Sequence, residues 1–307
     1  MGRSDIPAVI LKCLQKIEPD ASYSGTIPRI ESSSGKRYFA KVGSASEKDQ
    51  FFGEAESLNA IKKAAAGLAP QMFAWGLADS DGDEATSSQS NAKPYFLSEY
   101  KDFSGSLTDK AAQTLAKRLA TEMHRSTSEN GKFGFGVPTF CGATRQENGW
   151  SDTWEECYDK LIGGLLDGLG KKGRFTELCR KGEEVRKRVI PHLLRSLKIE
   201  PVILHGDLWS GNTGTDRVTG EPVIFDPSSY YGHNEADLAI ARIFGGFPSS
   251  FYNTYHQNLP KSEPADQYEL RADLYELYHY LNHTLLFGGS YAGSATHKMD
   301  RLLRECP

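Results

Sequence analysis

Residues 204–212 of the chain read LHGDLWSGN, and this stretch decides how the rest is interpreted. It follows a β-branched apolar run and places a carboxylate, Asp207, five residues before an amide, Asn212. A second carboxylate, Asp226, ends another short apolar run. Taken singly, each of these residues would be a turn former or a strand-end cap, as Asp and Asn beside Gly and Pro often are. The set in this order, beside two strand candidates, instead favours a functional site.

The Asp-to-Asn spacing is that of the kinase catalytic loop H-R-D-L-x-x-x-N, in which Asp receives the hydroxyl proton and Asn holds magnesium. We therefore predict that Asp207 is the catalytic base and that Asn212 and Asp226 bind Mg²⁺. Asp237, a little further along the chain, is expected to fix the loop backbone.

A Lys–Glu pair is predicted upstream. Lys41 stands in a strand candidate at 36–42, where alone it would extend to solvent. A helix candidate follows at 47–66, and on its roughly 100° per residue Glu54 lies about 40° from the centre of the apolar stripe. Glu56 lies roughly 160° away, on the opposite face. An inward Glu after an inward Lys is the arrangement with which kinases hold Lys against the α- and β-phosphates of ATP.

The nucleotide-covering turn is weakly marked. Residues 22–26, SYSGT, contain one glycine and fall short of G-x-G-x-x-G, although Ser24 and Gly25 are small enough for their backbone amides to approach phosphate. The backbone near Glu99 and Tyr100, at the end of another strand candidate, is expected to pair with adenine. No Walker-A sequence occurs, so a P-loop NTPase is excluded.

The acceptor is expected to be a small molecule or a glycan-type adduct. Pro227 follows Asp226 where protein kinases have Phe-Gly, and no Ala-Pro-Glu motif follows. These departures disfavour a protein kinase.

The chain has 307 residues, enough for two lobes that share a cleft. We predict an α+β, two-lobed protein-kinase-like fold. Residues 1–102 would form a small β-rich nucleotide-binding lobe with one inward-facing helix, and residues 103–307 a larger, mainly helical catalytic lobe. Within these lobes Gly25 is expected to mark a turn, Ser106 to begin a helix through a capping box, and Gly163-Gly164 to interrupt another helix.

Composition excludes several classes of partner. The 36 basic and 40 acidic residues give a net charge of −4 without a basic block, so nucleic acid is not expected as a partner. Five scattered cysteines indicate reduced thiols. No run approaches the roughly 18 apolar residues of a membrane span, and no signal peptide is evident. We expect a cytoplasmic protein without membrane contact.

Beyond the catalytic loop, longer segments identify a family. The chain resembles the fructosamine/ketosamine 3-kinases, a branch of the aminoglycoside phosphotransferase and choline kinase-like superfamily. The segments that carry the resemblance are HGDLWSGN (205–212), FDPSSYYGHNEADLA (225–239), FGGFPSSFY (244–252), LNHTLLFGGSY (281–291), FGFG (133–136) and CGxTxQxN (141–148). The H-G-D-x-x-x-x-N core is shared by the superfamily, whereas Trp209 and the D-P-x-x-Y-Y-G-H and L-N-H-x-x-L-F-G-G-S-Y segments are family-specific.

The resemblance implies phosphorylation, by ATP with Mg²⁺, of the C3 hydroxyl of ketosamines, either free adducts or glycated lysines on proteins. The unstable product leads to deglycation. It further implies Trp209 and His283 as sugar-contacting residues, Tyr231 as a lining residue of the acceptor site, and a monomer or homodimer. The preferred sugar, fructosamine, ribulosamine or psicosamine, stays open. One departure is that residues 22–25 lack the cysteine that many relatives carry in the nucleotide-covering loop, which argues against a redox switch there.

Two alternatives remain at this point. One is a kinase for another small hydroxyl compound, choline- or aminoglycoside-like, because the core motif is shared. The other is a non-catalytic nucleotide-binding scaffold, suggested by the poor glycine loop and opposed by the complete set of catalytic residues.

Overall fold

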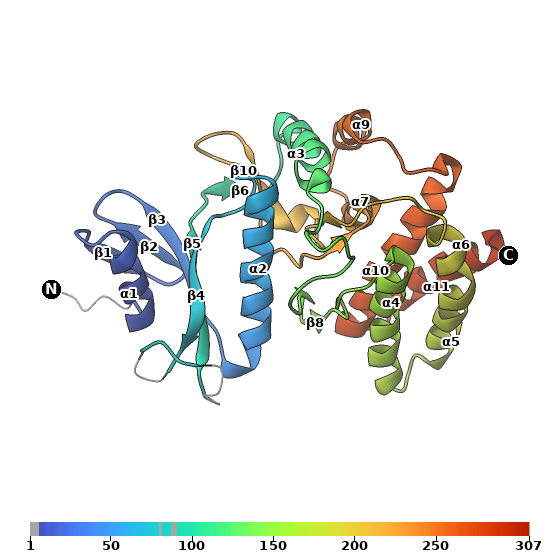
Figure 1. The fold of residues 1–307 in the computed structure, drawn as a ribbon, viewed down its shortest axis with the longest axis horizontal. Coiled ribbons are helices and arrows are strands. Elements are labelled where there is room, and N and C mark those ends of the chain that lie inside the picture. The colour runs from blue at the N-terminus through green and yellow to red at the C-terminus, as the bar shows by residue number, and fades with distance from the viewer. Residues whose placement is uncertain (1–5, 80–81, 87–90, 307) are drawn as a thin grey trace.

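The computed structural model describes residues 6–79, 82–86 and 91–306, and it has a sheet-rich N-terminal part beside a helical part (Figure 1). The N-terminal part is an antiparallel sheet in the order β1-β2-β3-β5-β4. Its strands are β1 (Tyr23–Thr26), β2 (Arg29–Ser32), β3 (Arg37–Val42), β4 (Met72–Ala78) and β5 (Lys93–Glu99).

Two helices flank this sheet. Helix α1 (Ala8–Ile17) buries its apolar stripe in a cluster with Ile30 and Leu97 of the sheet. Helix α2 (Lys48–Ala64) stands between the sheet and the helical part (Figure 1). It buries Leu58 in a cluster that also contains Leu208 of the catalytic loop. The inward helix of the N-terminal part therefore touches both parts of the molecule, as an ATP-site helix must.

The helical part is built around α10 (Tyr268–Phe287), which packs against α4, α8 and α11. Its other helices are α3 (Asp109–Thr121), α4 (Trp154–Lys171), α5 (Thr176–Glu184), α6 (Ile190–Leu194), α7 (Asn234–Asp237), α8 (Ala239–Phe244), α9 (Ser249–Asn258) and α11 (Ser290–Glu305). The chain also forms the short strands β6 (Phe103–Ser104), β7 (Phe140–Cys141), β8 (Thr144–Arg145), β9 (Val202–Ile203), β10 (Thr213–Asp216), β11 (Pro222–Ile224) and β12 (Tyr231–Gly232). The sheet-rich and helical parts occur in the predicted order, whereas the boundary at residue 102 stays a prediction.

Three local predictions were wrong, two of them because glycines allow close packing inside an element instead of ending it. Gly25 lies inside β1, where a Cβ atom would approach the carbonyl oxygen of Arg29 to 2.7 Å. Helix α4 continues through Gly163-Gly164, where the guanidinium of Arg186 would lie 3.0 Å from a Cβ at Gly163. Helix α3 is capped by Thr108, whose hydroxyl accepts the N–H of Ala111 at 3.2 Å, and not by Ser106.

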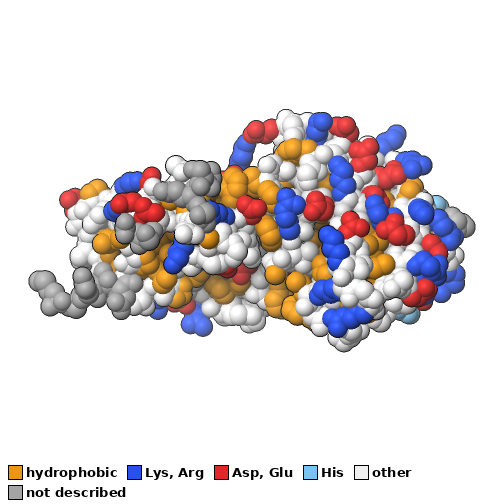
Figure 2. Space-filling model, turned by 90° about the horizontal axis from the view of Figure 1, so that it is seen from below, with side chains coloured by type: hydrophobic (Ala, Val, Ile, Leu, Met, Phe, Trp, Pro, Cys, Tyr) orange, Lys and Arg blue, Asp and Glu red, His pale blue; other side chains and the backbone are white. Residues whose placement is uncertain are grey.

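Charge is mixed over the surface. On the face seen in Figure 2, basic and acidic side chains are interspersed over the helical part. Within the described residues no helix combines the length and the apolar character needed to cross a membrane.

Candidate functional site

The catalytic loop is fixed by a buried carboxylate. It leaves β9, and the backbone N–H groups of His205 and Gly206 donate to the two carboxylate oxygens of Asp237, at 2.9 and 2.8 Å. Gly206 has φ of +83°, and a Cβ atom there would lie 2.2 Å from the carbonyl oxygen of Ser228. Only glycine fits this conformation and approach. The expected role of Asp237 in fixing the loop is thus confirmed.

Asp237 remains ionised in its buried position. Burial by itself would raise the pKa of Asp237, but the His124 ring, 3.1 Å away, and the His205 backbone outweigh it, so the pKa is lowered. The other ring nitrogen of His124 lies 2.7 Å from the hydroxyl of Tyr255. The loop therefore rests on a buried, hydrogen-bonded network, an arrangement that fixes one conformation.

Asn212 is hydrogen-bonded to Asp207. Its Nδ2 donates to the backbone carbonyl of Asp207 at 2.9 Å and to the carboxylate at 3.2 Å. Burial raises the pKa of Asp207 to about 7; the hydrogen bonds from Asn212 and Cys141 oppose the rise, and the nearby charge of Asp226 adds to it. A carboxylate with a pKa near neutrality is suited to accept a proton.

Lys41 and Glu54 meet as predicted. The Nζ of Lys41 lies 2.5 Å from Oε2 of Glu54, with the rings of Phe51 and Phe96 at 4.9 and 4.8 Å from the ammonium. Burial raises the pKa of Glu54, and the charge of Lys41 opposes the rise. The ammonium is thus held in place by one carboxylate and two aromatic faces.

The predicted catalytic residues share one cleft of about 330 Å³ between the two parts of the molecule. It is lined by Lys41, Gln50, Glu54, Phe140, Gly142, Asp207, Trp209, Asn212, Asp226 and Pro227. Asp226 has φ of +53°, a conformation that residues other than glycine seldom adopt and that persists mainly at functional sites.

A second cavity of about 270 Å³ shares Glu54 and Asp226 with this cleft. Its walls are largely apolar, with Leu58, Phe96 and Phe225 among them, and Glu99 and Tyr100 lie at its edge. The sheet already uses two backbone amides here: Glu99 donates to the carbonyl of Gln71 at 2.8 Å and Tyr100 to that of Arg37 at 3.2 Å. These two N–H groups cannot also pair with a base. If adenine binds near Glu99 and Tyr100 as predicted, it must pair with other backbone groups.

An aromatic wall extends from the catalytic loop toward the end of α10. The ring of Trp209 lies 5.9 Å from Phe244, and Phe244 lies 5.0 Å from His283. Tyr291 lies 5.0 Å beyond His283, and Phe287 beside it is 70% exposed. The family resemblance implied a role for Trp209 and His283, whereas the other three rings were not predicted. The signal was present in the four-residue spacing of His283, Phe287 and Tyr291.

Comparison with known proteins agrees with this geometry. The sequence profile of the fructosamine kinase family matches residues 22–305. The chain belongs to the fructosamine kinase family. Membership makes it a kinase with a hydroxyl group as phosphate acceptor.

Individual relatives extend the comparison. The ketosamine-3-kinase of Mus musculus is 37% identical over 87% of this chain and 88% of its own length. The chloroplastic protein-ribulosamine 3-kinase of Arabidopsis thaliana is 43% identical over 68% of this chain and 62% of its own. A putative fructosamine-3-kinase structure from Thermobifida fusca superposes with a TM-score of 0.74 at 25% identity, covering 92% of this chain and 93% of that one.

The fold extends beyond the family. A choline kinase of Streptococcus pneumoniae, 14% identical, superposes with a TM-score of 0.56 over 97% of this chain and 98% of its own. The predicted protein-kinase-like fold is confirmed.

Three predicted site residues of this fructosamine kinase lie apart from the cleft. The prediction for Tyr231 was wrong: β12 pairs with β9, and the Tyr231 ring stacks on Trp150 at 6.1 Å in a separate hollow beside Lys63. Ser24 and Gly25 lie in β1 and line neither the cleft nor the apolar cavity.

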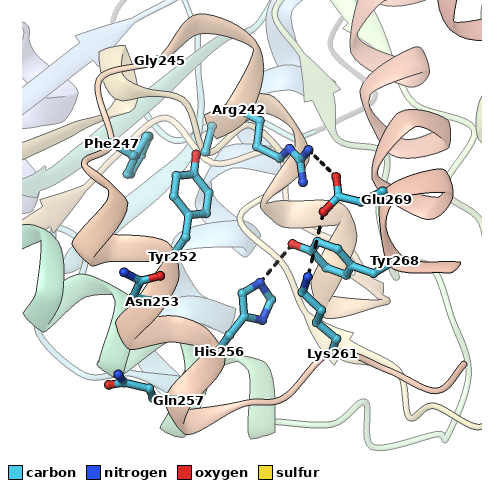
Figure 3. Close-up of a pocket in the computed structure, with 11 residues that line it drawn as sticks. Arg242, Gly245, Phe247, Tyr252, Asn253, His256, Gln257, Lys261, Tyr268 and Glu269 are labelled. Atoms are coloured by element: carbon cyan, nitrogen blue, oxygen red, sulfur yellow. Dashed lines mark hydrogen bonds and ion pairs between the residues drawn. The ribbon is translucent and has the colours of Figure 1, made fainter. Parts of the chain in front are cut away.

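A larger hollow, about 790 Å³, lies elsewhere, along α8, α9 and the start of α10 (Figure 3). Its charges are already paired: Arg242 lies 2.8 Å from Glu269, and Lys261 lies 3.9 Å from the same carboxylate. None of the predicted catalytic residues lines it. The volume of a cavity alone therefore does not identify the catalytic site of this kinase.

Proposed function

We propose that the protein phosphorylates the C3 hydroxyl of ketosamines with ATP and Mg²⁺, and that this leads to deglycation. One observation carries the proposal: the Lys41–Glu54 pair, Asp207 with Asn212, and Asp226 face a single cleft with Trp209 at its rim. The names of the related ketosamine and ribulosamine kinases support the class of acceptor.

The adenine of ATP would occupy the apolar cavity beside β5. Because the amides of Glu99 and Tyr100 are engaged in the sheet, pairing would use the carbonyl of Glu99 and the N–H of Lys101. The phosphates would then reach Lys41, which Glu54 keeps oriented. Such positioning and charge neutralisation supply most of the catalysis in phosphoryl transfer.

The cleft contains the oxygen donors that Mg²⁺ prefers. The amide nitrogen of Asn212 donates its hydrogen bonds to Asp207, so its Oδ1 remains as the ligand atom. The carboxylate of Asp226 faces the same cleft. Bound there, Mg²⁺ would neutralise charge on the phosphates.

The acceptor sugar would lie against Trp209 and the neighbouring rings of Phe244 and His283, whose apolar faces suit the C–H surface of a sugar. Asp207 would accept the proton of the C3 hydroxyl while that oxygen bonds to the γ-phosphorus. The bond between the γ-phosphorus and the bridging oxygen breaks, and ADP leaves. Either a free adduct or a glycated lysine on a protein could supply the hydroxyl.

The test is a transfer assay with purified protein, ATP, Mg²⁺ and fructoselysine. We expect phosphate on C3 of the sugar, identified by NMR, and its loss in Asp207→Asn. ATP turnover that no ketosamine stimulates would refute the proposal.

The shared fold of choline kinase motivates a second arm of this assay. Choline and an aminoglycoside replace the ketosamine under the same conditions. A higher kcat/KM for either compound would assign the protein to another acceptor class, whereas preference for fructoselysine or a ribulosamine supports the proposed one.

A further inference from the structure

Three possible metal ligands converge behind the catalytic base. A thiol sulfur from Cys141 in β7, a carboxylate oxygen of Asp207 and a ring nitrogen of His279 in α10 all lie within 4.8 Å of one another. Cys141 and His279 are 2% and 4% exposed. The Cys141 thiol lies close enough to the carboxylate of Asp207 to oppose the rise in the pKa of that group.

The surroundings of this cluster contain polar atoms without partners. Nδ1 of His279 and Oδ1 of Asn282 are buried and have no hydrogen-bond partner among the described residues. The Nδ2 of the same Asn282 donates to the carbonyl of Cys141 at 3.2 Å. Buried polar atoms in native proteins are nearly always satisfied by protein, water or an ion. The imidazole of His279, whose ring supplies one of the three clustered ligand atoms, therefore has a nitrogen that no described residue engages.

The donor set selects the species. Thiolate sulfur, imidazole nitrogen and one carboxylate oxygen are ligands of Zn²⁺, which takes four in a tetrahedron, whereas Mg²⁺ demands six oxygens. The cluster is thus chemically distinct from the Asn212 and Asp226 pair proposed for Mg²⁺.

We propose that Cys141, Asp207 and His279 form a site for one soft divalent cation of the Zn²⁺ type, with water as its fourth ligand. The ion would enter from the cleft, which Asp207 and Gly142, the neighbour of Cys141, both line. Zn–S and Zn–N bonds of about 2.3 and 2.0 Å bring ligand atoms roughly 3.3–3.6 Å apart, so the side chains close around the ion. The thiol releases its proton to solvent on binding.

Occupation of this site would take Asp207 away from the acceptor hydroxyl. The cation would therefore inhibit phosphoryl transfer, and a chelator would restore it. The site itself does not depend on which acceptor the kinase uses.

Cobalt reports such a site directly. We would titrate the metal-free full-length chain with Co²⁺ in the presence of excess Mg²⁺ and record absorption. One Co²⁺ per chain is expected, with a near-ultraviolet thiolate-to-cobalt charge-transfer band that Zn²⁺ abolishes. Cys141→Ser should lose the band. Cys179→Ser, which alters a partly exposed thiol on α5, should keep it.

A second variant tests the imidazole. Since even outer-shell partners contribute 10–100-fold to metal affinity, His279→Gln should weaken Co²⁺ binding by about tenfold or more. Circular dichroism would check the fold of each variant, and His279→Gln decides the question if Cys141→Ser does not fold. Absence of Co²⁺ binding in the presence of Mg²⁺, a band that survives Cys141→Ser, or unchanged affinity in His279→Gln would overturn the proposal.

Discussion

Gly206 donates its backbone N–H to Oδ1 of Asp237 at 2.8 Å, across 31 positions of the chain. The second oxygen of Asp237 accepts from His205, so one buried carboxylate holds two consecutive amides of the catalytic loop. Asp207, the proposed base, follows directly. Its position therefore depends on a buried residue that does not itself line the cleft.

Replacing Asp237 by Asn should lower the free energy of unfolding by about 3–5 kcal/mol at pH 7, because an amide nitrogen would face a backbone N–H in a buried site. The pKa of Asp237 is lowered in the folded state. The stabilisation is thus present above the unfolded pKa, about 3.9, and is lost as the pH falls through the folded pKa. Urea unfolding of wild type and variant at pH 7 and pH 3 measures this.

The matched control is Asp300→Asn, which removes an exposed ion pair with Lys181. Exposed pairs contribute about 1 kcal/mol or less, so this variant should resemble wild type. A difference between Asp237→Asn and wild type that is as large at pH 3 as at pH 7 would contradict the assigned role of the charge.

Two carboxylates of α2, Glu54 and Glu56, provide a paired test of nucleotide positioning. Glu54→Gln removes the charge that orients Lys41, and hydrogen bonds to charged groups contribute about 1.5–3 kcal/mol. We expect kcat/KM for ATP to fall about ten- to a hundredfold. Glu56→Gln changes a carboxylate on the same helix that lines a separate hollow, and this variant should leave kcat/KM for ATP unchanged. Equal effects in steady-state assays of the two variants would refute the pairing of Lys41 with ATP.

The carboxylate of Asp207, the proposed base, should lower the stability of the fold at neutral and higher pH. Its pKa is raised to about 7, chiefly by burial, against about 3.9 in the unfolded chain. Between these values the folded state retains a proton that the unfolded state releases, so stability declines as the pH rises through this window and stays lower above it. Asp207→Asn lacks this titration.

Without metal, Asp207→Asn should therefore be more stable than wild type by a few kcal/mol at pH 8, with little difference at pH 4. Thermal unfolding at the two pH values provides the measurement. A variant that is less stable than wild type at pH 8 would show that the carboxylate stabilises the fold.

The sequence could predict features that depend on residues close together in the chain, but not those that depend on contacts between distant segments. The sequence could bring Asp207 and Asn212 together because one loop fixes their spacing. It indicated Asp226 because that residue ends a short apolar run, and Glu54 because helical periodicity fixes its face. The aromatic wall could not be predicted from the sequence, because Phe244 contacts His283 only through the packing of α8 on α10. Tyr231 was misplaced because strand pairing with β9, a long-range event, sets the direction of its side chain.

Trp209 and Trp75 are both 37% exposed, which makes them a matched pair for testing the acceptor wall. Trp209 lies in the cleft against Phe244, whereas Trp75 lies on β4 against Phe52, 4.6 Å away. An aromatic contact with the sugar is worth about 1–2 kcal/mol, so Trp209→Ala should raise KM for the ketosamine roughly five- to thirtyfold. KM for ATP should not change, because the apolar cavity proposed for adenine lies beside β5 and Trp209 does not line it. Trp75→Ala should leave both constants as in wild type.

The contrary outcome would be a Trp209→Ala variant with a raised KM for ATP and an unchanged KM for the ketosamine. The aromatic wall would then belong to the nucleotide side of the cleft, and the acceptor would have to bind elsewhere.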